Sequence, residues 1–185
     1  MRAGFVLLVA ALVYLDEGYL LWMVVGSAVM HELGHYIPLK IFGGKVLLLE
    51  LSGGGLTMEH DAREKLGYGK ELASVVMGPI LSIGFALLFS LLNDMMLWQI
   101  AGICLTHGIF NLLPMSGLDG GRALEIILAM RGSAAPQSAV RVTTAVCGAI
   151  LGGFCVLLAV LYHNPSLLLA LLYLLALRKR KAVTA

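Results

Sequence analysis

The sequence predicts an all-α protein that crosses a membrane several times. Of its 185 residues, 59% are hydrophobic and 13% are charged, whereas soluble domains contain roughly 45–50% apolar and about 25% charged residues. The formal net charge of +2 is too small for a surface that binds nucleic acid phosphates. The three cysteines are widely separated within apolar segments, which excludes a disulfide framework and a clustered cysteine site for zinc. Of the classes of protein considered, a polytopic membrane protein is the one that fits this composition.

Long segments without charged side chains mark the expected membrane-spanning helices, because a charge is costly in hydrocarbon. No charged residue lies between Glu71 and Asp94 or between Asp94 and Asp119. The uncharged segment after Arg141 is too long for one crossing, and we expect a turn at Pro165, since proline interrupts a helix. The chain is therefore expected to form one integral-membrane domain over residues 1–185. Its six predicted helices cover residues 3–16, 19–41, 71–93, 96–113, 139–162 and 166–179.

The distribution of basic residues predicts which side of the membrane each loop faces. With the N-terminus in the cytoplasm, six spans place all 13 lysines and arginines on the cytoplasmic side, including the cluster at 178–181. The opposite connections, near Asp16, Asp94 and His163, contain none. Because basic residues accumulate in cytoplasmic loops, we expect a multi-pass protein of the cell membrane with both termini in the cytoplasm.

The hydrophilic segment between the second and third predicted helices is expected to form a small, membrane-associated β-hairpin. A β-prone run that contains Val46, Leu47, Leu48 and Leu49 precedes the glycines at 53–55, and a second β-prone run follows them. Such runs on both sides of a glycine turn are typical of hairpins. An exposed strand edge could hold an extended peptide. An amphipathic or re-entrant loop over the cytoplasmic mouth is the alternative.

A cluster of ionisable residues in the second predicted helix indicates a metal site. His31 and His35 are four residues apart and share a helix face, so both imidazoles can bind one ion. Glu32 lies beside them, where it can reach a water molecule bound to that ion. This is the His-Glu-x-x-His pattern, in which two histidines bind zinc and the glutamate is a general base. Ionisable side chains in a membrane helix usually serve a function, which favours metal binding over a polar cluster that packs helices.

A catalytic zinc ion usually takes three protein ligands, and Asp119 is the best candidate for the third. It is the only carboxylate between Asp94 and Glu125, and we expect it at the same cytoplasmic level as the two histidines. Two alternatives stay open. Asp119 could instead cap a helix at about 121–130. His107 could be the third ligand, although a lone histidine in a span more often forms a hydrogen bond to a neighbouring helix.

These residues resemble the motifs of the site-2 protease family of intramembrane zinc metalloproteases. The resemblance rests on residues 31–35 (HELGH) and 111–121 (NLLPMSGLDGG), whose order, separation and membrane level are similar to those of the family. Within the family, the chain resembles the bacterial sporulation-type branch. The segment 78–82 resembles a further family element, but Ser82 stands where that element commonly has asparagine.

The resemblance implies one Zn2+ ion per chain, with His31, His35 and Asp119 as its ligands and Glu32 as the general base. It also implies that Asn111 contacts the substrate or the developing oxyanion, and a hydrogen bond between helices is an equally weighted alternative for that amide. The family further implies that the predicted hairpin is a substrate-binding sheet.

The expected activity is hydrolysis of a peptide bond in or near the transmembrane segment of a membrane-bound regulatory protein, at the cytoplasmic side. The expected partners are a single-span membrane protein as substrate and the lipid bilayer, and a membrane regulatory partner is compatible with the sequence. One alternative is a membrane divalent-metal transporter, although transporters commonly show repeat symmetry. A metallopeptidase for substrates outside the membrane is a closer alternative. A catalytically silent module that retains a partner would not need the general base. The sequence does not indicate an oligomeric state.

Overall fold

The computed structural model describes residues 19–44, 46–52, 55–60 and 67–162. The predicted helices at 3–16 and 166–179 lie outside the described residues. The elements follow one another as α2 (Leu20–Ile41), β1 (Val46–Ser52), β2 (Gly55–His60), α4 (Tyr68–Ser90), α5 (Met95–Asn111), α6 (Asp119–Met130) and α7 (Pro136–Tyr162).

Four of the six segments predicted as helices are helical among the described residues, as α2, α4, α5 and α7. By length and composition, α4 and α7 are the two described helices that are long and apolar enough to cross a membrane. Asp94 separates α4 from α5 and caps α5, because its Oδ1 accepts hydrogen bonds from the backbone N–H groups of Met96 and Leu97 at 2.9 and 3.0 Å. Asp94 therefore marks the boundary between the two helices in the sequence and also caps the first turn of α5.

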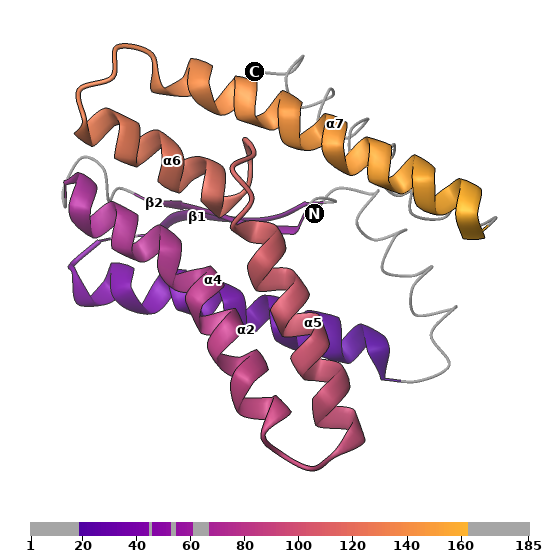
Figure 1. Ribbon diagram of the computed structural model, residues 1–185. Coiled ribbons are helices and arrows are strands. Elements are labelled where there is room, and N and C mark those ends of the chain that lie inside the picture. The colour runs from indigo at the N-terminus through magenta and orange to yellow at the C-terminus, as the bar shows by residue number, and fades with distance from the viewer. Residues whose placement is uncertain (1–18, 45, 53–54, 61–66, 163–185) are drawn as a thin grey trace.

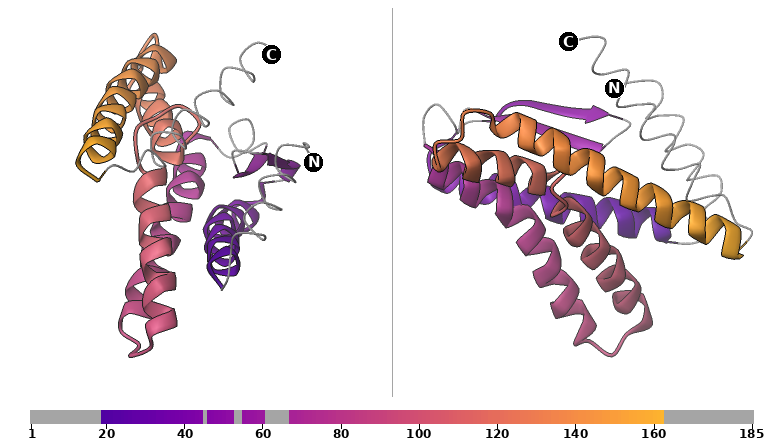
Figure 2. Two further views of the ribbon diagram at one scale, coloured as in Figure 1. Left: turned by 90° about the vertical axis from the view of Figure 1, so that its right-hand side faces the viewer. Right: turned by 45° about the horizontal axis from the view of Figure 1, so that its top comes forward.

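Helix α4 is the centre of the assembly. It contacts α2, α5 and α6, whereas α7 packs on α6. In Figure 1, α4 and α5 form an antiparallel pair that α2 crosses, and α6 and α7 lie together near one end of that pair. Figure 2 shows α2 and α7 on opposite sides of the α4–α5 pair. Val75 of α4 joins Ala123 and Ile126 of α6 in a small buried apolar cluster.

Glycines allow the helices to approach closely where they cross. A Cβ atom added to Gly34 of α2 would lie only 2.7 Å from the Cα atom of Gly78 on α4. A Cβ atom added to Gly108 of α5 would lie 3.0 Å from the carbonyl oxygen of Pro79. Contacts between small residues of this kind let helix backbones touch. Side chains from α2, α4 and α5 therefore meet near residues 78–79.

The segment between α2 and α4 contains a two-stranded antiparallel sheet. Ser52 pairs with Gly55 and Leu51 with Leu56, which places the connection at residues 53–54. The pairing is irregular between Val46 and Leu48. The strands thus lie where the sequence predicts a strand, a glycine turn and a second strand.

Candidate metal centre

Three ligand atoms from two elements converge where the first residue of α6 meets α2. The Nε2 atom of His31 lies 3.0 Å from Oδ2 of Asp119, and the Nε2 atom of His35 lies 3.1 Å from the same oxygen. The two Nε2 atoms are 3.2 Å apart. His31 is buried, and His35 and Asp119 are partly buried. His31 and His35 lie one helix turn apart in α2. The carboxylate of Asp119, from a distant part of the chain, therefore joins them.

The hydrogen bonds on the far side of each imidazole leave the converging nitrogens free to bind a cation. Nδ1 of His35 lies 2.9 Å from the backbone carbonyl of Ser74, which can only accept a hydrogen bond, so Nδ1 carries the proton. Nδ1 of His31 lies 3.0 Å from the hydroxyl of Ser82, which can accept in the same way. With Nδ1 as the donor on the far side, the Nε2 lone pair of each imidazole is available to a cation, as in metal-bound histidines.

The spacing of these atoms suits zinc. Ligand bonds of about 2.0–2.1 Å in a tetrahedral site separate neighbouring ligand atoms by roughly 3.3 Å, and the three separations here are 3.0–3.2 Å. Two nitrogens and one carboxylate oxygen form a donor set that zinc accepts, with one coordination position left for water or substrate. The residues present therefore fit the zinc ion that the sequence predicts.

Helix α4 provides the groups that orient both histidines. Ser74, Gly78 and Ser82 are spaced by four residues and share one face of α4. A Cβ atom on Gly78 would overlap the His35 ring, so only glycine leaves room for that imidazole. Ser82 is fully buried beside His31. The four-residue spacing in the sequence indicates a shared helix face, but this role follows only from the packing of α4 on α2.

His107 lies against the cluster without joining it. Its ring stacks on the His31 ring, with a centroid distance of 4.5 Å and an interplanar angle of 17°. Its Nδ1 atom lies 3.2 Å from the hydroxyl of Ser27 on α2. Among the described residues, the converging ligand group consists of His31, His35 and Asp119 and does not include His107. The hydrogen bond to a neighbouring helix, rather than the ligand role, describes His107 here.

Asp119 begins α6 and does not cap it. Leu118 is the N-cap residue and makes no side-chain capping bond, so the interpretation of Asp119 as a cap is wrong. The carboxylate instead points to the histidines. One turn later, Arg122 donates from Nη2 to Oε1 of the buried Glu71 on α4 at 3.2 Å. This ion pair fixes the start of α6 against α4.

Glu32 is partly buried on α2 and directly follows His31 in the sequence. Its place beside the cluster agrees with the predicted general base, a role that stays a prediction. Asn111 donates from Nδ2 to the carbonyl oxygen of His107, one turn earlier in the same helix, at 3.1 Å. This bond is not the expected bond between helices, and the oxyanion role stays a prediction.

The four predicted substrate-binding residues of the hairpin all lie on β1. Their contact with a substrate stays a prediction. They are Val46, Leu47, Leu48 and Leu49.

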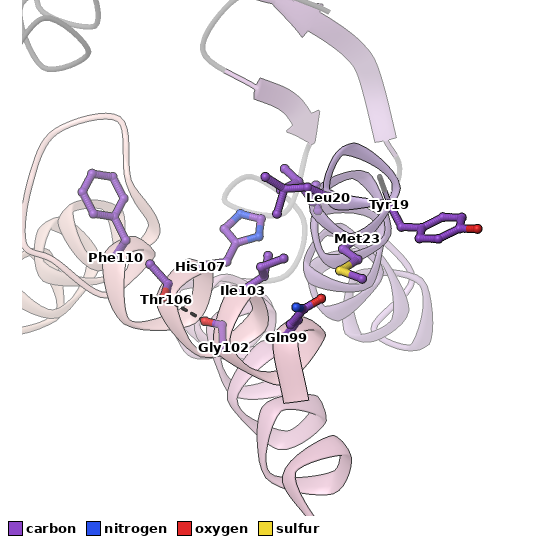
Figure 3. A pocket seen from close by; sticks show the side chains of 11 residues that line it. Tyr19, Leu20, Met23, Gln99, Gly102, Ile103, Thr106, His107 and Phe110 are labelled. Atoms are coloured by element: carbon purple, nitrogen blue, oxygen red, sulfur yellow. Dashed lines mark hydrogen bonds between the residues drawn. The ribbon is translucent and has the colours of Figure 1, made fainter. Parts of the chain in front are cut away.

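A separate apolar cavity of about 1140 Å³ lies between α2 and α5 (Figure 3). Its lining includes Met23 of α2 and Ile103, His107 and Phe110 of α5. The three converging residues do not line it. His107 therefore separates this cavity from the metal centre.

The comparisons with known proteins agree with the geometry. The model of peptidase family M50 matches residues 57–154. A zinc metalloprotease of Methanocaldococcus jannaschii is 34% identical over 122 residues, which cover 57% of this chain and 33% of that protein. The chain thus spans about a third of the length of this curated relative.

The structure resembles that of the site-2 protease from Methanocaldococcus jannaschii, with a TM-score of 0.61. The match has 24% sequence identity and covers 91% of this chain and 82% of the other. The helical fold is therefore shared with a solved site-2 protease. The narrower resemblance to the sporulation-type branch stays a prediction. Since the family model covers more than half of the sequence, the chain belongs to peptidase family M50, the family of the site-2 proteases.

Proposed function

We propose that this chain is an intramembrane zinc metalloprotease that cuts a membrane-bound regulatory protein in or near its transmembrane segment, at the cytoplasmic side. The observation that carries the proposal is the convergence of one oxygen of Asp119 with Nε2 of His31 and His35. Membership of family M50 supports it. These three residues would hold one Zn2+ ion per chain.

Each residue of the cluster has a defined chemical task in this proposal. When bound, zinc would lower the pKa of a coordinated water molecule and polarise the carbonyl of the scissile bond. Glu32 would accept the proton of the attacking water and donate it to the leaving amine. Ser82 and the Ser74 carbonyl would hold the two imidazoles in the tautomer that binds metal. Asn111 would use its second amide hydrogen to stabilise the developing oxyanion.

The proposed setting is a multi-pass bundle of six spans with both termini in the cytoplasm. Two apolar helices, α4 and α7, support the membrane setting. The absence of basic residues from the three connections assigned to the outer side supports the orientation. In this topology, the metal centre lies on the cytoplasmic half of α2, which gives water a short path to it.

The two-stranded sheet is the proposed site for holding the substrate open. A transmembrane helix buries its peptide bonds in internal hydrogen bonds, so the substrate must unwind before cleavage. Among the described residues, β1 pairs with β2 along one edge. An extended substrate segment could add to a strand edge at residues 46–49, where backbone hydrogen bonds would replace those of the unwound helix.

Co-expression with single-span membrane proteins tests the proposal. We expect the native chain to cleave a substrate near its cytoplasmic end and Glu32→Gln to lose at least about 100-fold in rate, because a general base contributes roughly 10²–10⁴-fold. Zinc should stay bound in this variant. Glu125→Gln, which makes the same chemical change on α6, is the matched control. Equal cleavage by native protein and Glu32→Gln would remove Glu32 from the mechanism.

A further inference from the structure

Two adjacent threonines of α7 hold the loop that leads to Asp119. The hydroxyl of Thr143 donates to the carbonyl oxygen of Pro114 at 2.6 Å. The backbone N–H of Ser116 donates to the hydroxyl of Thr144 at 2.7 Å. Thr143 thus donates to a backbone carbonyl of the loop, and Thr144 accepts from a backbone N–H of the loop. Both backbone groups lie within residues 112–118, which we call the ligand loop.

The protons available on each threonine hydroxyl determine which group donates in these two hydrogen bonds. The Thr144 hydroxyl donates its proton to the carbonyl of Val140 at 2.6 Å, so towards Ser116 it acts as acceptor. The Thr143 hydroxyl has a longer contact of 3.1 Å to the Val140 carbonyl and a shorter one to Pro114. The pair is therefore specific for the hydroxyl group and would not form with valine.

The ligand loop touches the start of α6 through backbone atoms. A Cβ atom on Gly120 would overlap the carbonyl group of Leu112, and one on Gly121 would overlap the carbonyl group of Met115. Such contacts leave no flexible side chain to absorb a shift of the loop. A displacement of the ligand loop would therefore move the backbone next to Asp119.

Two hydrogen bonds connect α7 to this loop. Val140 is the one buried residue of α7 among those described, whereas Val142 and Val146 are more than half exposed. Backbone polar groups of an irregular segment at membrane depth need partners within the protein. The threonine pair provides two such partners at the point where the loop meets α7.

We infer that Thr143 and Thr144 are positioning residues that hold Asp119 in line with His31 and His35. The inference rests on the proposed metal-binding function of these three residues. The ligand loop links α7 to the backbone next to Asp119 at Gly120 and Gly121, while the Arg122–Glu71 ion pair holds α6 against α4. Neither threonine belongs to the converging ligand group of His31, His35 and Asp119.

Zinc affinity of the full-length purified protein tests this role, measured by competition with a chromophoric chelator. We expect Thr143→Val/Thr144→Val to bind zinc about tenfold more weakly, the lower end of the range for groups that orient metal ligands. Thr143→Ser/Thr144→Ser keeps both hydroxyls and should restore native affinity. Thr106→Val on α5 is the matched control, because the Thr106 hydroxyl bonds to the Gly102 carbonyl of its own helix at 2.8 Å.

The outcomes separate this inference from the proposed function. Native zinc affinity in the double valine variant, with or without a lower unfolding temperature, would overturn the positioning role alone. Weaker zinc binding that the serine pair restores would support it, even where no cleaved substrate is known. Native protein that binds no zinc would overturn both proposals. If the double valine variant does not fold, Thr143→Val and Thr144→Val are compared separately, and native affinity in both would overturn the inference.

Discussion

The two halves of the candidate metal centre are held in place by different means. On the histidine side, α2 and α4 touch through Gly34 and Gly78, and each imidazole is bound from behind by a group of α4. On the aspartate side, Asp119 stands at the start of a helix that a loop and an ion pair position. Close backbone contacts exist on both sides, at Gly34 and Gly78 and at Gly120 and Gly121. Groups of α4 bond the imidazoles directly, whereas the anchors on the aspartate side reach the carboxylate through the backbone beside it. We therefore expect substitutions next to the histidines to weaken metal binding more than substitutions at the anchors of the aspartate side.

The largest effect is expected from filling the contact on the histidine side. Gly78→Ala places a methyl group in the space of the His35 ring, so we expect zinc affinity to fall about 100-fold or more, at or beyond the upper end of the range for loss of an orienting group. Gly84→Ala on the same helix is the control, because a Cβ atom there meets nothing within 4 Å. Native zinc affinity in Gly78→Ala, measured by chelator competition, would show that the histidine side is not rigid.

A smaller effect is expected from removing the hydroxyl behind His31. Ser82→Ala leaves Nδ1 of His31 without its observed partner, and loss of such a group typically weakens metal binding by about 10–100-fold. We expect a change near tenfold, because the imidazole stays packed against His107. Ser90→Ala, at the far end of α4, should leave zinc affinity unchanged. Equal affinities of the two variants would contradict an orienting role for Ser82.

The smallest effect is expected from the ion pair on the aspartate side. Arg122→Met removes the charge that faces the buried Glu71 but keeps an apolar side chain. We expect the free energy of unfolding to fall by about 1.5–3 kcal/mol, the range for a hydrogen bond to a charged group, and zinc affinity to fall only a few-fold. Chemical denaturation and chelator competition on the same sample measure both quantities. A loss of zinc affinity as large as that of Gly78→Ala would erase the difference between the two halves.

Much of the fold follows from local sequence signals. Long segments without charge predict α4, α5 and α7, because a charged side chain is costly in an apolar span. The histidine spacing predicts a shared face of α2 for the same local reason. Asp119 could be proposed because few other carboxylates are available near that depth.

The rest of the site depends on which helix faces lie in contact, and the sequence does not encode these contacts locally. Ser82 and Gly78 act on the histidines only because α4 crosses α2 at that height. The role of Thr143 follows only from the position of α7 beside the ligand loop. The amide of Asn111 bonds to its own helix rather than to another helix, and its contact with a substrate stays a prediction. Roles of this kind become visible only with the tertiary arrangement.

Zinc analysis of the purified native protein beside Asp119→Ala tests the central claim most directly. The account predicts one zinc ion per native chain and a large loss of bound zinc in Asp119→Ala, while His107→Ala keeps the metal. A native protein that is free of zinc after purification without chelators, or an Asp119→Ala variant that retains the full amount, would contradict the account.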